Sequence, residues 1–212
     1  IMQEALEVPV ALETDVNAAA LAEARQGAGA SVSSFLYITI GTGIGGSFVE
    51  EGRCLHGANH PEMGHIRVPR ASDDDFAGVC DYHRDCLEGL ASGPAIHARW
   101  GYSPEELPDD HPAWALQAHY LAHACATFVY VFAPARIILG GGIMQRSHLF
   151  PLIRSRLQAL LGGYPDVSNL FGSLDAYVVP PALGTRSGLL GALQLAEDAQ
   201  AASPDSPLSP LV

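Results

Sequence analysis

Four side chains that bind soft metal ions gather in one stretch, and this cluster constrains the fold more than any other feature of the chain. Cys80, His83 and Cys86 follow one another at intervals of three residues, so one short loop can wrap three donors around an ion, and His65 comes from an earlier segment. Structural zinc is held by four Cys or His ligands in a tetrahedron. The spacing therefore predicts a zinc ion that folds residues 60–90.

Other interpretations of this stretch remain open. It could be a solvated loop with two free thiols, or Cys80 and Cys86 could form a disulfide, which a reducing compartment disfavours. A zinc hydrolase is disfavoured, because four protein ligands leave no coordination position for a reactive water. Two carboxylates, Glu62 and Glu88, flank the cluster. We interpret them as substrate contacts, with exposed loop charges as the alternative.

A glycine-rich segment, residues 41–46, follows an apolar run at 35–40 that is typical of a strand. A dinucleotide-binding loop opens into a helix and a Walker loop continues with Gly-Lys, whereas this segment opens into Ser47-Phe48-Val49, which favours a second strand. We therefore predict a hairpin turn in which the backbone amides and the hydroxyl of Thr42, next to Gly43, face a phosphate. A purely structural glycine hairpin is the alternative.

Asp15 stands between residues 8–12, expected to form a short strand, and the Ala-rich residues 16–26, expected to form a helix. The amides and the dipole at a helix N-terminus favour an ionised carboxylate. Such a carboxylate suits a base that accepts a proton from a hydroxyl group. The alternative is that Asp15 only caps the helix, as Asp often does.

The remaining elements are expected from periodicity and from Gly and Pro signals, and together they indicate an α/β chain. Further strands are predicted at 47–50, 136–139 and 176–179, further helices at 94–100, 111–132, 146–161 and 187–199, and irregular structure at 53–90.

Composition excludes several classes of function. The formal net charge is -12 and the chain has eleven Lys and Arg, so no concentrated basic face for nucleic acid is expected. No apolar stretch of about eighteen residues and no secretory leader is visible, so we expect a cytoplasmic protein that does not span a membrane. A nucleotide could still bind through glycine amides and magnesium.

Taken together, the motifs resemble those of the ROK family of sugar kinases and repressors. The resemblance covers most of residues 8–195, and its departures, His83 in place of a third Cys and the His-Pro-Glu-Met start, are similar to the fructokinase-like branch. The matching segments are Thr14-Asp15-Val16-Asn17 for the catalytic base, Gly41-Thr42-Gly43-Ile44-Gly45-Gly46 for a phosphate loop, His60-Pro61-Glu62-Met63-Gly64-His65 with Cys86-Leu87-Glu88 for the sugar and zinc signature, and Leu139-Gly140-Gly141-Gly142 for a nucleotide-side turn.

The resemblance implies the actin-like ATPase fold of hexokinases, mostly its C-terminal domain with a zinc loop, and Mg²⁺-dependent phosphorylation of a hexose by ATP, with fructose 6-phosphate as the product. It implies Asp15 as the base; Thr14, Glu62, His65 and Glu88 as sugar contacts; and Thr42, Gly43, Pro94, Gly141 and Gly142 as nucleotide contacts. The three glycines after residue 139 could equally be a structural connection.

Position 14 is informative about the sugar. ROK glucokinases usually have Asn before the base, and this chain has Thr14. A hydroxyl donates one hydrogen bond and cannot reproduce the two-sided contact of an amide, which favours a ketohexose over glucose.

ROK kinases also open with an Asp-x-Gly-Gly-Thr phosphate loop, which the 212 residues lack. We therefore expect residues 1–200 to be the C-terminal portion of such a kinase, a disordered tail at 201–212, and a homodimer. The alternative function is a truncated, non-catalytic sugar-binding or regulatory protein.

Overall fold

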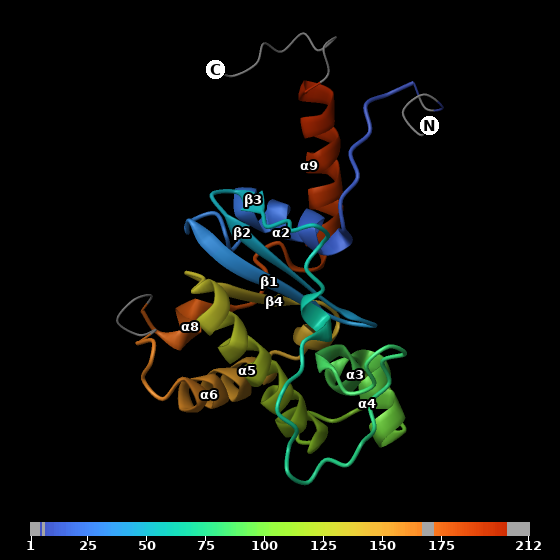
Figure 1. Cartoon of the computed structure of the whole chain (residues 1–212), viewed down its shortest axis with the longest axis vertical. Coiled ribbons are helices and arrows are strands. Elements are labelled where there is room, and N and C mark those ends of the chain that lie inside the picture. Colours follow the sequence, from blue (N-terminus) through green and yellow to red (C-terminus); the bar gives the residue numbers. More distant parts are fainter. Residues whose placement is uncertain (1–4, 6, 167–171, 203–212) are drawn as a thin grey trace.

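The computed structural model describes Ala5 and residues 7–166 and 172–202, and it consists of a mixed sheet with helices on both faces (Figure 1). The strand order is β3-β2-β1-β4-β5. The strands are β1 (Ser34–Ile40), β2 (Ile44–Glu50), β3 (Arg53–Cys54), β4 (Ile137–Gly140) and β5 (Val178–Val179). β1 pairs antiparallel with β2 and parallel with β4, so the sheet is antiparallel on one side of β1 and parallel on the other.

The central strand β1 is buried on both faces because its side chains alternate between two cores. Leu36, Ile38 and Ile40 pack into the larger core, while Phe35 and Tyr37 pack into the smaller one on the opposite face. β-branched and aromatic residues suit such a strand, since they fill space on a pleated surface.

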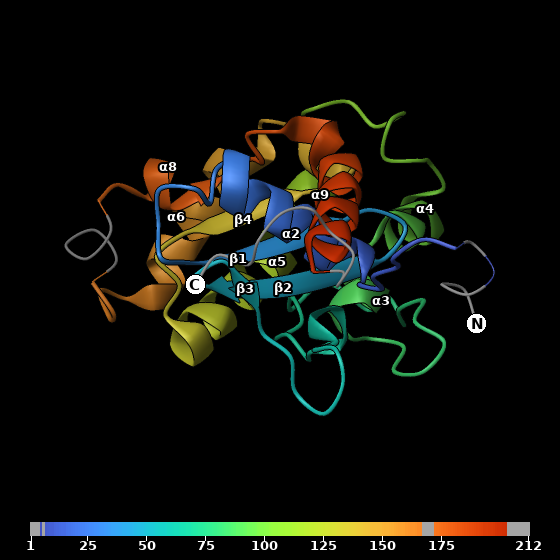
Figure 2. The same cartoon turned by 90° about the horizontal axis from the view of Figure 1, so that it is seen from above.

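The helices form two layers that Figures 1 and 2 show on opposite sides of the sheet. α2 (Asp15–Gln26) and α9 (Ser187–Ala201) cover one face, and α5 (Ala113–Phe132) and α6 (Leu149–Leu161) cover the other, with the short α3 (Leu87–Ala91) and α4 (Gly93–Trp100) beside them. The remaining elements are η1 (Met63–His65), η2 (Ile143–Gln145), α8 (Leu174–Tyr177) and η3 (Gly184–Arg186). α2 and α9 touch at Gly191, where an added methyl group would overlap the carbonyl oxygen of Ala18.

Most of the predicted elements are confirmed. The strands expected at 35–40, 47–50 and 136–139 are β1, β2 and β4, and the helices expected at 16–26, 94–100 and 111–132 are α2, α4 and α5. Helix α4 begins as its sequence suggests, because the Ser92 hydroxyl accepts a hydrogen bond from the Ala95 amide at 3.4 Å.

Four expectations were wrong in detail. Residues 8–12 form no strand: they pair with no other described strand, and the side chains of Val8 and Leu12 are 51% and 82% exposed. Only the second half of 176–179 is strand, because α8 occupies the first half. α6 begins at Leu149, after η2, rather than at 146. Residues 53–90 are not wholly irregular, because they contain β3, η1 and α3.

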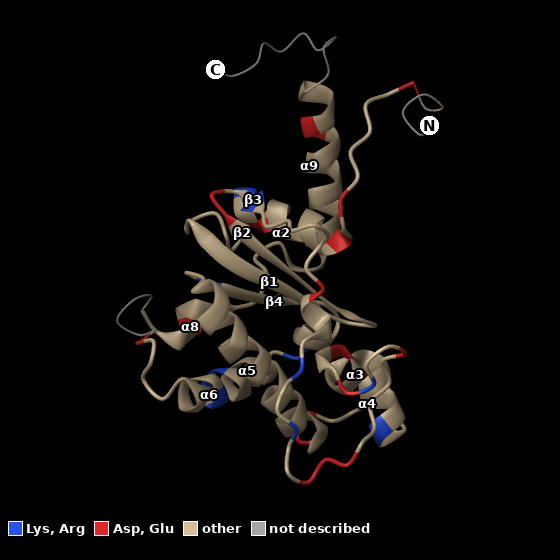
Figure 3. Ribbon diagram, viewed as in Figure 1, with Lys and Arg blue, Asp and Glu red and all other residues tan. Residues whose placement is uncertain are grey.

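Helix α9 extends to Ala201, one residue into the predicted tail, and residues 203–212 lie outside the described residues. No described helix is long and apolar enough to cross a bilayer. Arg residues are scattered over several elements in the described part of the chain (Figure 3).

The loop that leads to the metal cluster is anchored by a buried ion pair. Arg99 donates hydrogen bonds to both carboxylate oxygens of Asp74, at 3.3 and 3.2 Å, and to the carbonyl of Leu90 at 3.0 Å. The two charged side chains are only 9% and 7% exposed, and the Tyr120 hydroxyl also donates to Asp74. These contacts fasten the loop to α4 and α5.

Asp74→Asn should lower the free energy of unfolding by about 3 kcal/mol, because the Arg99 guanidinium would stay buried without a countercharge. Urea denaturation of the purified chain measures this change. Asp73→Asn, one residue earlier and exposed, is the matched control and should have little effect. Equal stability of the two variants would show that the pair does not anchor the loop.

Candidate functional site

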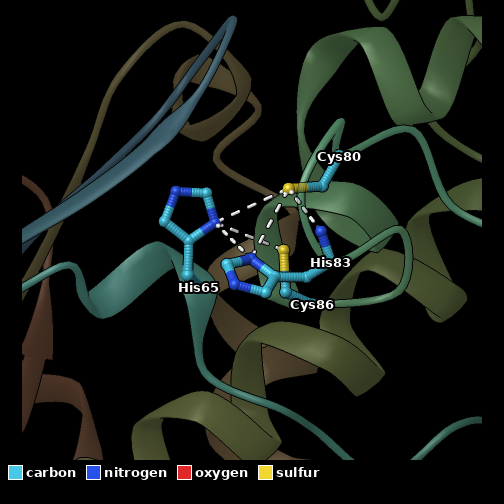
Figure 4. A group of neighbouring side chains, drawn as sticks. All are labelled: His65, Cys80, His83 and Cys86. Atoms are coloured by element: carbon cyan, nitrogen blue, oxygen red, sulfur yellow. Dashed lines mark hydrogen bonds between the residues drawn. The ribbon is translucent and has the colours of Figure 1, made fainter.

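The four predicted metal ligands come together in the structure (Figure 4). The Nδ1 atoms of His65 and His83 are 3.3 Å apart, and Cys80 Sγ lies 3.7 and 3.8 Å from them. Cys86 Sγ lies 3.5 Å from His65 Nδ1. Both cysteines are free thiols, so the disulfide alternative is wrong.

These distances fit zinc. Bonds of about 2.3 Å to sulfur and 2.0–2.1 Å to nitrogen in a tetrahedron place ligand nitrogens roughly 3.3 Å apart and nitrogen–sulfur pairs roughly 3.6 Å apart. All four ligand atoms lie within 4.8 Å of one another. The Nδ1 atom of His65 faces the cluster, which leaves Nε2 on the other side of the ring (Figure 4).

Backbone pairing shapes the loop that carries the ligands. Cys80 and Arg84 form an antiparallel bridge around a tip where Arg84 has a left-handed φ of 60°. Cys86 then pairs with Arg67 and serves as the N-cap of α3. Backbone pairing therefore fixes the positions of Cys80 and Cys86, and a metal site needs ligands that are held in place in this way.

The metal cluster and the glycine turn meet at Ile44, the first residue of β2. From one side, Gly64, next to the ligand His65, packs so closely that an added methyl group would overlap the carbonyl oxygen of Ile44. From the other side, Glu88, two residues after the ligand Cys86, accepts a hydrogen bond from the Ile44 amide at 2.9 Å. An ion that joins His65 to Cys86 would tie together the two segments that hold the end of the turn.

The glycine segment is a hairpin turn, as predicted, although only residues 41–43 form the loop and residues 45–46 belong to β2. The Gly41 carbonyl accepts a hydrogen bond from the Gly93 amide at 2.7 Å. Glu88 and Gly93, on both sides of the α3–α4 junction, thus hold both ends of the turn. Thr42 at its tip is exposed.

A cleft of about 560 Å³ opens at the carboxyl ends of the parallel strands β1 and β4. Its walls come from the start of α2, the ends of the two strands, the η2–α6 region and residues 180–188. Ligands commonly bind beyond the carboxyl ends of parallel strands. Predicted residues that line the cleft are Asp15, Gly141 and Gly142.

The other predicted residues lie outside this lining. Thr42, Gly43 and Glu88 gather at the glycine turn, and Pro94, the second residue of α4, is exposed beside it. Glu62 is exposed at the start of η1. The structure therefore places the predicted residues in two groups, one at the cleft and one between the glycine turn and the metal cluster.

Asp15 is not the N-cap of α2. Thr14 has that role, because its hydroxyl oxygen accepts a hydrogen bond from the Asn17 amide at 3.2 Å. Asp15 is the first helical residue, and one carboxylate oxygen accepts from the Val16 amide at 2.8 Å. The Asp15 side chain is exposed at the cleft. Because Thr14 caps the helix, the Asp15 carboxylate is oriented by the helix start and is not used as the cap.

Sequence reasoning missed a hydrogen-bonded cluster behind this helix start. The Glu13 carboxylate accepts from the Thr14 amide and the Asn17 side chain, both at 2.9 Å, and contacts His56 at 3.1 Å. Burial alone would raise the pKa of Glu13, but these donors outweigh it and hold the pKa below its ordinary value. No sequence signal marks this cluster, because His56 comes from a different loop.

Two further features of the cleft follow from close packing. Gly141 has φ 91°, and a methyl group there would overlap the backbone of Ile40, so the chain needs glycine at this wall. Tyr37 faces the same cleft, and burial, followed by the nearby charge of Glu23, raises the pKa of its hydroxyl.

Residues 1–199 match the ROK family. A Bacillus subtilis (strain 168) relative named "Putative fructokinase" is 48% identical over 194 residues, which are 92% of this chain and 65% of the relative. The chain belongs to the ROK family. A Pediococcus pentosaceus protein named fructokinase is 41% identical over 93% of this chain and 67% of its own length. The chain thus spans about two thirds of the length of these relatives.

Solved structures agree with this assignment. The ROK hexokinase from Thermus thermophilus has a TM-score of 0.75 and 30% identity over 92% of this chain and 67% of that structure. A ROK family glucokinase from Streptomyces griseus, solved with glucose and AMPPNP, has a TM-score of 0.62 and 27% identity over 92% of this chain and 70% of that structure. The chain has the actin-like ATPase fold that its motifs predicted.

The purified chain should contain one zinc ion, held by His65, Cys80, His83 and Cys86. Cys86→Ser should lose the ion, and the amide of Ile44 should then exchange faster with solvent, since only the backbone pairing at Arg67 and Cys86 would still join the two segments that hold it. Metal analysis and hydrogen exchange measure the two effects.

Cys54→Ser, which alters a partly buried cysteine outside the cluster, is the control and should keep the ion. Full zinc content in Cys86→Ser would contradict the proposed ligand set, and unchanged exchange at Ile44 after zinc loss would contradict its link to the glycine turn.

Proposed function

We propose that this chain provides the catalytic base, the sugar contacts and one side of the nucleotide site of a sugar kinase that transfers the γ-phosphate of ATP to a hexose, with fructose as the preferred substrate. The observation that supports this most is the position of Asp15, at the start of α2 and at the mouth of a cleft lined by Gly141 and Gly142. The names of the relatives agree with it.

Asp15 would act on the hydroxyl that attacks. Its carboxylate accepts the proton of the sugar hydroxyl as that oxygen bonds to the γ-phosphorus and the bond to the leaving oxygen of ADP breaks. The Val16 amide holds one carboxylate oxygen at 2.8 Å, which leaves the other for the substrate. Fixed orientation of this kind contributes to rate because the base need not be reoriented in the transition state.

Four side chains would contact the sugar, from two directions. Thr14 lies next to the base, and its hydroxyl can still donate while its oxygen accepts from the Asn17 amide. Glu88 uses Oε2 for the Ile44 amide and keeps Oε1, and His65 uses Nδ1 in the metal cluster and keeps Nε2. Glu62 is exposed at the start of η1, near His65.

The nucleotide would lie in the 560 Å³ cleft, with Gly141 and Gly142 against it and the turn at Thr42 and Gly43 toward its phosphates. Magnesium bound to ATP would neutralise charge that builds up on the phosphate oxygens during transfer. Zinc would have a structural role, because four protein ligands complete its coordination. Residues 1–200 would form this portion of the kinase, and residues 201–212 would be a tail.

Activity is best tested in a chimaera in which this chain replaces the region that it matches in the Bacillus subtilis relative. The chimaera should release ADP when given fructose, ATP and magnesium. Asp15→Asn should lower its turnover by a factor on the order of 10² or more, because the base is lost while the shape stays. A coupled ADP assay measures turnover, and circular dichroism checks the fold.

Asp110→Asn removes the same charge at an exposed position and should leave turnover unchanged. Normal turnover in Asp15→Asn would reject Asp15 as the base. A folded chimaera without any ADP release would favour the alternative, a non-catalytic sugar-binding or regulatory protein.

Thr14→Asn should raise the ratio of kcat/KM for glucose over fructose, by roughly tenfold if one hydrogen bond decides the preference. Asn is as good an N-cap as Thr, so α2 should be unaffected. Thr14→Ser keeps the hydroxyl and should keep the ratio. A ratio that does not change in Thr14→Asn would show that position 14 does not select the sugar.

A further inference from the structure

Glu23 is the one acidic side chain that is fully buried among the described residues. It lies on α2 two turns after Asp15, and no described cation forms an ion pair with it. Burial of a carboxylate is costly unless hydrogen bonds replace its hydration. Such a residue is therefore expected to have a specific task.

The carboxylate of Glu23 accepts four hydrogen bonds, two on each oxygen. Oε2 accepts from the amides of Ala28 and Ala182, at 2.7 and 3.0 Å. Oε1 accepts from the Leu183 amide at 3.0 Å and from the Ser187 hydroxyl at 2.7 Å. Two of the four donors, the amides of Ala182 and Leu183, belong to the segment between β5 and α9, and Ser187 is the first residue of α9.

This segment is a wall of the cleft. Pro181, Gly184, Thr185 and Ser187 line the cleft, and the amides at 182 and 183 turn away from it toward Glu23. The segment has little regular structure of its own, since it contains only a turn and η3. Its position relative to α2 therefore depends on the carboxylate of Glu23.

A general role in joining α2 to α9 would not require a charge. The two helices already pack backbone to backbone at Gly191 and Ala18, and Ala19, Ala20 and Ala22 on α2 are buried without polar partners. An apolar residue would fill position 23 at lower cost than a carboxylate. The hydrogen bonds from the four donors to Glu23 fix the position of the wall. Apolar packing alone would not fix it, because it has no directional preference.

We propose that Glu23 is a positioning residue for the nucleotide: through Ala182, Leu183 and Ser187 it fixes the wall of the cleft at the distance that a nucleoside triphosphate requires. The inference rests on the proposed function, because it assigns the nucleotide to this cleft. Glu23 itself does not line the cleft. The same helix then carries the proposed base at its start and the support of the nucleotide wall in its third turn.

Glu23→Gln tests this with little change in shape, because the amide group would point its hydrogens at two of the four donors. Amides 182 and 183 should exchange faster with solvent, and affinity for ADP should fall on the order of tenfold, as expected when buried donors lose their acceptor. Hydrogen exchange and calorimetric titration of ADP into the 212-residue chain measure both effects. The zinc content should stay unchanged.

Two controls separate positioning from stability. Glu197→Gln makes the same change at an exposed site on α9 and should bind ADP normally. Leu157→Ala removes a fully buried side chain of α6 away from this wall, so it should lower stability without moving the wall.

Gly27→Ala is a second test variant, because its methyl group would overlap Glu23 Oε2 and displace the carboxylate, so it should also weaken ADP binding.

The outcomes distinguish the two proposals. Unchanged ADP affinity in both Glu23→Gln and Gly27→Ala, or an equal loss in Leu157→Ala, would overturn the role of Glu23 while the nucleotide cleft stands. A wild-type chain that binds no ADP would overturn the nucleotide assignment itself, and the role of Glu23 with it.

Discussion

The geometry of the site depends on how Ile44 is held. Its carbonyl is in backbone contact with Gly64 and its amide bonds to Glu88, so neither segment can shift without moving the start of β2. These two segments are joined by the backbone pairing of Arg67 with Cys86 and by the Leu87 amide, which donates to the Ile66 carbonyl at 2.9 Å, and the cluster of His65 and Cys86 lies at the same junction. A structural metal ion bound there would thus help to determine where the glycine turn lies, because ligand geometry is more rigid than loop packing.

Helix α2 organises the other side of the site in a comparable way. Its first residue is Asp15, and Glu23 fastens the opposite cleft wall to the same rigid element. The distance between the proposed base and that wall is then set by a length of helix, which deforms far less than a loop. The cluster of metal-binding side chains therefore lies with one group of predicted residues, and the buried carboxylate with the other.

Local chemistry made much of this predictable from sequence. The grouping of His65, Cys80, His83 and Cys86 could be predicted because His and Cys at short spacing have few other uses, and the hairpin because the residues after the glycines favour a strand. β1 and α5 follow from apolar runs of sufficient length. The signals for the strand, the helix and the hairpin each lie within one segment, whereas the cluster also needs His65 from an earlier segment.

The omissions arise from contacts between residues distant in sequence, whereas the error at the start of α2 is local. Asp15 was a candidate N-cap by residue type, and Thr14 took the role because its hydroxyl reaches the Asn17 amide. Glu23 carries no signal at all, since a Glu within an Ala-rich helix is normally solvated. Three of its four donors, Ala182, Leu183 and Ser187, lie 159 to 164 residues away in the chain. Gly64 and Gly191 likewise look ordinary in sequence, yet each is required by a backbone that passes too close for a side chain. Tertiary approach, rather than local preference, therefore selects Glu23, Gly64 and Gly191.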